Sequence, residues 1–133
     1  MTERPPSKRQ FLAQVLTGSP ADCMEVAKKI IGRQIPANLG MLAKIGQDKS
    51  LGIWQRIAAI YALGFLGEWE FTKTLGDILA DPTDDLAVRS HAAEALGNLG
   101  DRHMADLLRD VLSRKPPKEL RESCKYALGE LGA

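Results

Sequence analysis

Two histidines and two cysteines are the side chains of this sequence that could take part in metal or nucleophilic chemistry. His91 and His103 are the only histidines, and the helical periodicity places them on different helices. A di-iron carboxylate site needs several convergent His and Glu ligands, and no His-Glu dipeptide occurs in the sequence. Cys124 takes a small-residue position of a predicted core, and Cys23 has no obvious histidine partner. The sequence therefore predicts no catalytic residue, no metal ligand and no cofactor.

Arginines and aspartates recur at fixed distances and could form ion pairs. Asp48 precedes Arg56 by eight residues, and Asp81 precedes Arg89 by the same distance. A third arginine, Arg121, has a serine in the place of the aspartate. Because buried ions are normally paired, we expect these five residues to form a structural ladder within or between repeats. Contact with a ligand is the alternative.

An aromatic strip is the feature that most favours a binding function. Trp54, Ile57, Tyr61 and Phe65 follow one another at spacings of three, four and four residues, so they share one outward-facing strip of a helix. Aromatic residues make up only 5% of the chain, which makes their clustering informative. Exposed aromatic clusters mark interfaces. We expect the strip to dock a protein or peptide; burial under the N-terminal helices and self-association are the alternatives.

The same strip has a different chemistry in the later repeats, where acidic residues and a tyrosine replace most of the aromatic residues. The predicted partner-binding residues are therefore six: Trp54, Ile57, Tyr61, Phe65, Glu94 and Tyr126.

These residues are positioned by an internal repeat. The sequence Ala-Leu-Gly-Phe-Leu-Gly at residues 62–67 recurs in related form at 95–100 and 127–132, at offsets of 33 and 32 residues. An arginine stands six residues before each copy, and a small residue stands three residues before it. The apolar positions follow i, i+3, i+4, i+7 spacing, which is typical of a helix with one buried stripe.

Glycines inside and after these helices predict how the helices pack and end. Gly64, Gly97 and Gly129 each cost about 1 kcal/mol against alanine inside a helix, so their repetition indicates that the next helix passes too close for a side chain. Gly67 and Gly100 stand where a helix should end, and we expect both to adopt the left-handed conformation.

The apolar periodicity and the turn residues predict an all-α chain of about eight helices in four antiparallel hairpins, without strands. The expected helices span residues 7–17, 20–33, 36–46, 50–66, 68–80, 84–98, 101–113 and 117–131. Ser19, Ser50 and Asp84 are the expected N-caps, and Pro20 is the expected first residue of its helix.

The repeat resembles the HEAT-like repeats first described in phycobilisome lyases. The resemblance rests on Asp81-Pro82 in the turn, followed by Val88-Arg89, Ala92-Ala93 and the stretch 95–101. It covers residues 36–132 well and residues 7–35 poorly. It implies a right-handed α-α superhelix, a HEAT-like solenoid, in which the second helix of each pair lines the concave face. Members of this family are mostly binding scaffolds, with some enzymes and lyase subunits among them.

The sequence also resembles the HEAT-like deoxyhypusine hydroxylases, which bind iron through His-Glu pairs placed just after the repeat arginine. The corresponding pairs here are Ile57-Ala58, Ser90-His91 and Glu122-Ser123. Since none of them is a His-Glu pair, this resemblance does not imply an iron site.

Composition limits the remaining classes of function. The 18 basic and 17 acidic residues give a net charge of +1, which disfavours a dedicated nucleic-acid binder. No apolar run approaches the roughly 18 residues of a membrane span. The polar start and the two unpaired cysteines predict a cytoplasmic protein. We expect a flexible basic tail at residues 1–6 and one domain at 7–133, with a degenerate hairpin at 7–35 and repeats at 36–67, 68–100 and 101–133.

Together these features predict a non-enzymatic interaction scaffold that binds a protein or peptide segment on its concave face, with a homodimer as an alternative partner. One rival is an accessory subunit of a lyase-type enzyme that acts on a protein-bound chromophore. Another is nucleic-acid binding through the basic N-terminal arm.

Overall fold

The computed structural model describes residues 7–16 and 18–133, and this part of the chain is all-helical, without a strand. Its α-helices are α1 (Lys8–Leu16), α2 (Pro20–Ile31), α3 (Leu39–Gln47), α4 (Ile53–Leu66), α5 (Thr72–Ala80), α6 (Leu86–Leu99), α7 (Ala105–Ser113) and α8 (Lys118–Glu130). Short 3-10 turns, η1 (Trp69–Phe71) and η2 (Arg102–Met104), precede α5 and α7. All predicted helix ends lie within four residues of the observed ones, and the predicted all-α solenoid is confirmed.

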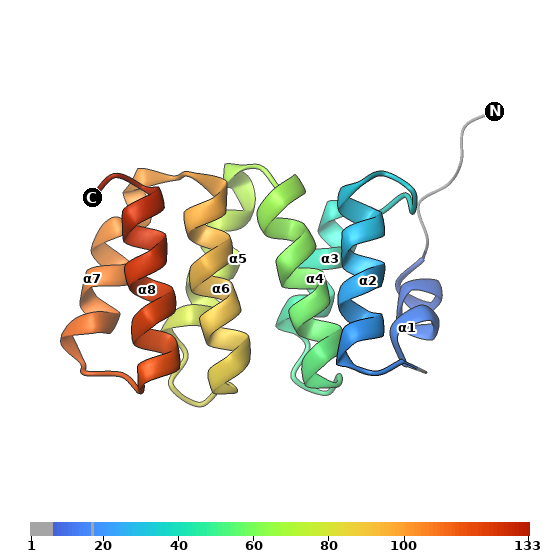
Figure 1. Ribbon diagram of the computed structural model, residues 1–133, viewed down its shortest axis with the longest axis horizontal. Helices are drawn as coiled ribbons and strands as arrows, with labels where there is room; N and C mark the ends of the chain where they lie inside the picture. Colours follow the sequence, from blue (N-terminus) through green and yellow to red (C-terminus); the bar gives the residue numbers. More distant parts are fainter. Residues whose placement is uncertain (1–6, 17) are drawn as a thin grey trace.

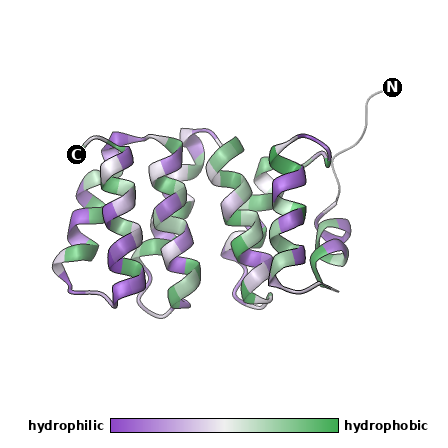
Figure 2. Cartoon of the chain, in the orientation of Figure 1, coloured by the Kyte–Doolittle hydropathy of each residue, from purple (hydrophilic) through white to green (hydrophobic). Residues whose placement is uncertain are grey.

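The helices form two layers. Helices α2, α4, α6 and α8 stand side by side in one layer, and α1, α3, α5 and α7 stand behind them (Figure 1). Apolar residues are concentrated on α4, whereas α8 is more hydrophilic (Figure 2). The reason is position: α4 packs against α2, α3 and α6, whereas α8 has α6 as its one neighbour in its own layer.

Two glycines allow the close packing within the front layer. A Cβ atom on Gly64 would lie 2.8 Å from the Cβ atom of Ala95, and one on Gly97 would lie 2.7 Å from the Cα atom of Ala127. The predicted close approach is therefore confirmed for α4 on α6 and for α6 on α8. Gly129 holds the same place in the third copy, but a Cβ atom there would have no neighbouring atom within 4 Å, because no described helix packs beyond α8.

The start of α2 follows the prediction. Ser19 is its N-cap and accepts a hydrogen bond from the Asp22 N–H, Asp22 accepts one from the Ser19 N–H, and Pro20 is the first helical residue. The predicted N-caps Ser50 and Asp84 are wrong.

The N-caps of α4 and α6 are Gly52 and Asp85, because both helices begin later in the chain than the periodicity suggested. Gly100 is left-handed, with φ of 77°, as predicted. Gly67 is not: its φ is −72° and its ψ is 161°, so the chain leaves α4 in an extended conformation toward η1.

Two sequence predictions stay untested by the fold. The basic tail at residues 1–6 lies outside the described residues. The division of the chain into one degenerate hairpin and three repeats stays a prediction.

None of the described helices combines the length and the apolar character needed to cross a bilayer.

Candidate functional site

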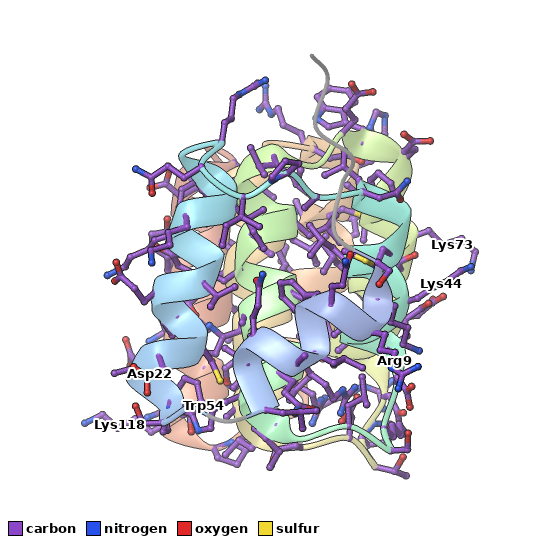
Figure 3. The ribbon with its side chains drawn as sticks, turned by 90° about the vertical axis from the view of Figure 1, so that its right-hand side faces the viewer. Arg9, Asp22, Lys44, Trp54, Lys73 and Lys118 are labelled. Atoms are coloured by element: carbon purple, nitrogen blue, oxygen red, sulfur yellow. The ribbon has the colours of Figure 1, made fainter. Side chains whose placement is uncertain are left out.

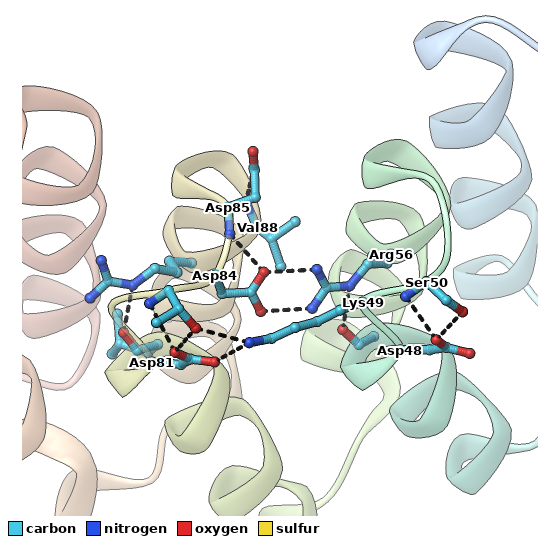
Figure 4. A network of polar contacts seen from close by, with 12 residues as sticks. Asp48, Lys49, Ser50, Arg56, Asp81, Asp84, Asp85 and Val88 are labelled. Carbon is cyan, nitrogen blue, oxygen red and sulfur yellow. Dashed lines mark hydrogen bonds and ion pairs between the residues drawn. The ribbon is translucent and has the colours of Figure 1, made fainter.

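A buried ion pair joins the second hairpin to the third. Arg56 donates from Nη1 and Nη2 to the two carboxylate oxygens of Asp84, at 2.8 and 2.7 Å, and from Nε to the Gly46 carbonyl oxygen at 3.0 Å (Figure 4). Both side chains are almost fully buried, with 4% and 3% of their surface exposed. The hydrogen bonds from Arg56 lower the pKa of the Asp84 carboxyl. Every donor that Arg56 uses points at a fixed acceptor, which is typical of a structural role.

Asp48 and Asp81 make different contacts from those predicted. Both are C-caps, of α3 and α5, and each carboxylate accepts hydrogen bonds from the residue two positions ahead, Ser50 or Thr83. Lys49 donates to Asp81 from the preceding hairpin at 2.5 Å, and its hydrogen bond is the largest cause of the lowered pKa of Asp81. The turn thus holds both aspartates away from the arginines.

The expected pairs Asp48–Arg56 and Asp81–Arg89 are therefore not formed among the described residues. Arg89 donates from Nε to the Leu79 carbonyl oxygen at 3.0 Å, the same contact that Arg56 makes one repeat earlier. The counterpart of Asp84 in the next repeat would fall at Pro116 or Pro117, so no carboxylate is available there. Arg121 is exposed, and its nearest acidic contact is Glu122 at 4.0 Å.

The aromatic strip is split by the structure. Trp54, Phe65 and Tyr126 are 39%, 51% and 44% exposed, and Tyr61 is half-buried. Ile57 was expected in the exposed strip, but it is fully buried. The reason is that α4 is packed by α2 on one side and α6 on the other, which leaves a narrower open face than a helix with one neighbour would have.

The exposed part of the strip lies on the layer of α2, α4, α6 and α8. Viewed from the N-terminal end, Trp54 and Lys118 lie on the side of this layer, whereas Lys44 and Lys73 lie on the opposite side (Figure 3). The ring of Trp54 stands edge-on to His91 of α6, with ring centroids 6.4 Å apart. Because Trp54 and Phe65 keep 39% and 51% of their surface exposed, the N-terminal helices do not bury them in the core.

Three helices enclose a cavity of about 240 Å³ beside this strip, which we call the aromatic pocket. Its lining residues come from α4, α6 and α8: Tyr61, Phe65, His91, Glu94, Ala95, Asn98 and Tyr126. The Tyr61 and Phe65 rings have centroids 5.1 Å apart. Across the pocket, the Tyr126 hydroxyl donates to Asn98 Oδ1 at 2.6 Å. Four of the six predicted partner-binding residues thus come together in one place.

Charge in the aromatic pocket is mainly negative. Burial raises the pKa of the Tyr126 phenol, and the carboxylates of Glu130 and Glu94 raise it further. His91 Nδ1 lies 3.6 Å from Glu94 Oε2. The sequence analysis did not predict His91 as a site residue, because His91 reaches the pocket only through the packing of α6 on α4. Its position three residues before Glu94, on the same face of the helix, could have indicated it.

Two other hollows on the described surface lack the combination of aromatic and acidic side chains found in the aromatic pocket. One of about 530 Å³ beside α7 is lined mainly by exposed polar residues, among them Arg102, Asp106 and Arg109. One of about 360 Å³ is lined by apolar residues of the α2–α3 region and by Leu66. Neither brings aromatic and acidic groups together.

The positions that would carry iron ligands do not fit an iron site. Ile57 and Ala58 are fully buried in the core. Ser90 is buried, and its hydroxyl donates to the Leu86 carbonyl oxygen. Across the described residues, no group of three or more His, Cys, Asp or Glu side chains is placed to hold a metal ion.

The remaining candidates for chemistry occupy structural positions. Cys23 is buried and donates from Sγ to the Val15 carbonyl oxygen at 3.2 Å. Burial raises the pKa of the Cys124 thiol to about 11, although the charge of Arg89 acts in the opposite direction. His103 lies in η2, 3.0 Å from the Asp101 carboxylate.

Comparison with known proteins agrees with this architecture. The family of HEAT repeats matches residues 53–129, more than half of the chain, and the chain belongs to this family. It is similar to curated deoxyhypusine hydroxylases: 39% identical over 70 residues to the one from Arabidopsis thaliana, 35% over 90 to the one from Kluyveromyces lactis, and 30% over 96 to the one from Mus musculus.

These matches cover 53%, 68% and 72% of this chain, but only 22%, 27% and 31% of the relatives. The chain thus spans less than a third of the length of these relatives. The relatives are named as enzymes, which contradicts the expectation of a non-enzymatic interaction scaffold.

Proposed function

We propose that this chain is an accessory component of an enzyme that acts on another protein. It holds that protein on the layer of α2, α4, α6 and α8, while another part of the enzyme supplies the reacting groups.

One observation carries this proposal: the chain shares its repeat with hydroxylases but lacks the ligand residues expected for their chemistry. The resemblance implies His-Glu pairs directly after the repeat arginines, and here these places hold Ile57-Ala58, Ser90-His91 and Glu122-Ser123. Only His91 and Glu122 are possible ligands, and neither belongs to a group of three or more His, Cys, Asp or Glu side chains among the described residues that could hold a metal ion. Function depends on the site and not on the fold, so the shared repeat does not by itself bring the chemistry of the hydroxylases to this chain.

The aromatic strip supports a protein as the bound molecule. Tryptophan and tyrosine, with arginine, are the residue types most enriched among those that carry the binding energy of protein interfaces. Trp54 and Phe65 of α4 and Tyr126 of α8 are exposed, so together they present an extended surface across the solenoid. A second copy of this chain is the competing occupant.

The size of the aromatic pocket favours a side chain over a chromophore. Sites for small molecules and cofactors measure about 300–1,000 Å³, and the aromatic pocket measures about 240 Å³. Among protein-modifying enzymes, we therefore favour one that recognises an amino-acid side chain over a phycobilisome-type chromophore lyase.

The test is deletion of the gene in the cell that makes the protein, followed by proteome-wide mass spectrometry of side-chain modifications. We expect one modification to disappear and to return with the wild-type chain, but not with Trp54→Ala. The control is Trp69→Ala, which removes an exposed tryptophan of η1, outside the strip; because the variant also loses the hydrogen bond from Trp69 Nε1 to the Leu99 carbonyl oxygen, its fold is checked by circular dichroism.

Two results would contradict the proposal. If no modification changes in the deletion strain, the chain is not part of a protein-modifying enzyme. If the purified chain alone carries out the modification, it is the catalyst itself and not an accessory component.

A further inference from the structure

We propose that the aromatic pocket binds the side chain of an arginine carried by the partner protein. The inference rests on the proposed function, because it names the chemical group by which the bound protein is held. It follows from the rings, the carboxylates and the size of the pocket.

The rings of the pocket suit a cation. Cations are attracted to the face of Tyr, Phe or Trp rings within about 6 Å of the centroid, and arginine makes this contact more often than lysine. The planes of the Tyr61 and Phe65 rings are tilted by 59°, so they face different directions within a small space. A planar guanidinium can stack on one ring while the other contacts its edge or its aliphatic stem.

The polar groups of the pocket are acceptors for a guanidinium. The Glu94 side chain is 41% exposed, and its Oε2 lies 3.6 Å from His91 Nδ1, which is beyond hydrogen-bond distance, so both carboxylate oxygens can accept from a guanidinium. Asn98 Oδ1 accepts one hydrogen bond from Tyr126 and keeps a second lone pair. A carboxylate beside an amide oxygen can therefore receive several of the five N–H donors of arginine.

The charge around the pocket also favours a cationic side chain such as arginine. No lysine or arginine is among its lining residues in the described chain, and the only basic group there is His91. Glu130 adds a second carboxylate near Tyr126. The resulting negative potential favours a cation and disfavours an acidic segment.

The experiment is a titration of the full chain, followed by NMR of its aromatic side chains. The probes are acetylated, amidated tripeptides Gly-Arg-Gly, Gly-citrulline-Gly and Gly-Lys-Gly. Citrulline has the shape of arginine without its charge. We expect the arginine peptide to shift the Phe65 and Tyr126 resonances and to bind roughly tenfold more tightly than the citrulline peptide, from one cation–π contact and one ion pair. The lysine peptide should bind more weakly than arginine.

Variants locate the binding. Phe65→Leu keeps an apolar side chain of similar size but removes the ring, and Glu94→Gln removes the charge. We expect each to weaken arginine binding about two- to fivefold. Glu25→Gln is the matched control, since it removes an exposed carboxylate of α2, a helix that does not line the pocket, and it should leave binding unchanged. Circular dichroism confirms that each variant is folded.

Equal binding of the citrulline peptide, equal binding of the lysine peptide, or no saturable shift by the arginine peptide would each overturn the inference. These comparisons use the wild-type chain, so they do not depend on the folding of a variant. Their failure leaves the proposed function standing, because that is judged by the modification lost on gene deletion.

Discussion

Arg56 of α4 and Asp84, which directly precedes the N-cap of α6, form a two-point ion pair that is buried between consecutive hairpins. The pair lies where two hairpins meet, so it fixes their relative position as well as neutralising a buried charge. Removing one partner of a buried pair leaves the other charge uncompensated.

Replacement of Asp84 tests the contribution of this pair to stability. Asp84→Ala should lower the free energy of unfolding by about 3–5 kcal/mol, because Arg56 is left buried without its carboxylate. The double variant Arg56→Met, Asp84→Leu should lose less than the single variant, since no charge is left buried. Urea unfolding followed by circular dichroism measures both. A single variant within about 0.5 kcal/mol of wild type, the range of neutral surface changes, would contradict the prediction.

The same pair predicts how stability depends on pH. Arg56 lowers the pKa of Asp84 in the folded chain below its ordinary value of 3.8. The stabilisation is therefore present above the unfolded pKa and is lost as pH falls through the folded pKa. Urea unfolding at pH 5, 4 and 3 should show a steeper loss for wild type than for Asp84→Asn. Parallel curves for the two proteins would show that other carboxylates control the acid response.

Two glycines at equivalent places of the repeat predict opposite effects of one substitution. Gly64→Ala should destabilise the fold by about 1–3 kcal/mol, because the new methyl group meets Ala95 of the next helix. Gly129→Ala should stabilise it by up to about 1 kcal/mol, because that place is open and alanine is the better helix former. Thermal unfolding of both variants measures the contrast. Equal changes in the two variants would mean that α4 and α6 can move apart at Gly64 without cost.

Ile57 and Trp54 belong to the same predicted strip, but their replacement by alanine should change the free energy of unfolding by different amounts. Ile57→Ala should cost about 2–5 kcal/mol, because it opens a cavity in the core. Trp54→Ala should cost less, since 39% of the side chain is already exposed to solvent. The free energy of unfolding in urea checks this order, and a larger loss for Trp54→Ala would reverse the assignment of core and surface on α4.

The parts of the fold that depend on local sequence were predictable. The repeated glycines and small residues indicated where helices approach, and the contacts of Gly64 with Ala95 and of Gly97 with Ala127 have that geometry. Ser19 and Pro20 marked the start of α2, because capping involves only neighbouring residues.

The parts that depend on how hairpins stack were not predictable from spacing. Arg56 stands eight residues after Asp48 but pairs with Asp84, 28 residues ahead, because the turn aspartate is held by its own turn. Ile57 shares a helical strip with Trp54 and Phe65, yet its burial is decided by two neighbouring helices at once.

The Arg56–Asp84 pair has no counterpart one hairpin later, where Pro116 and Pro117 take the place of the aspartate. The solenoid is thus clamped at one joint and held at the next mainly by apolar packing and by the hydrogen bond from Tyr126 to Asn98. Acid should therefore loosen the joint between α4 and α6, which contains the ion pair, before the joint between α6 and α8, where the aromatic pocket opens. Protection of the amides from hydrogen exchange, compared at pH 5 and pH 3, would report this order.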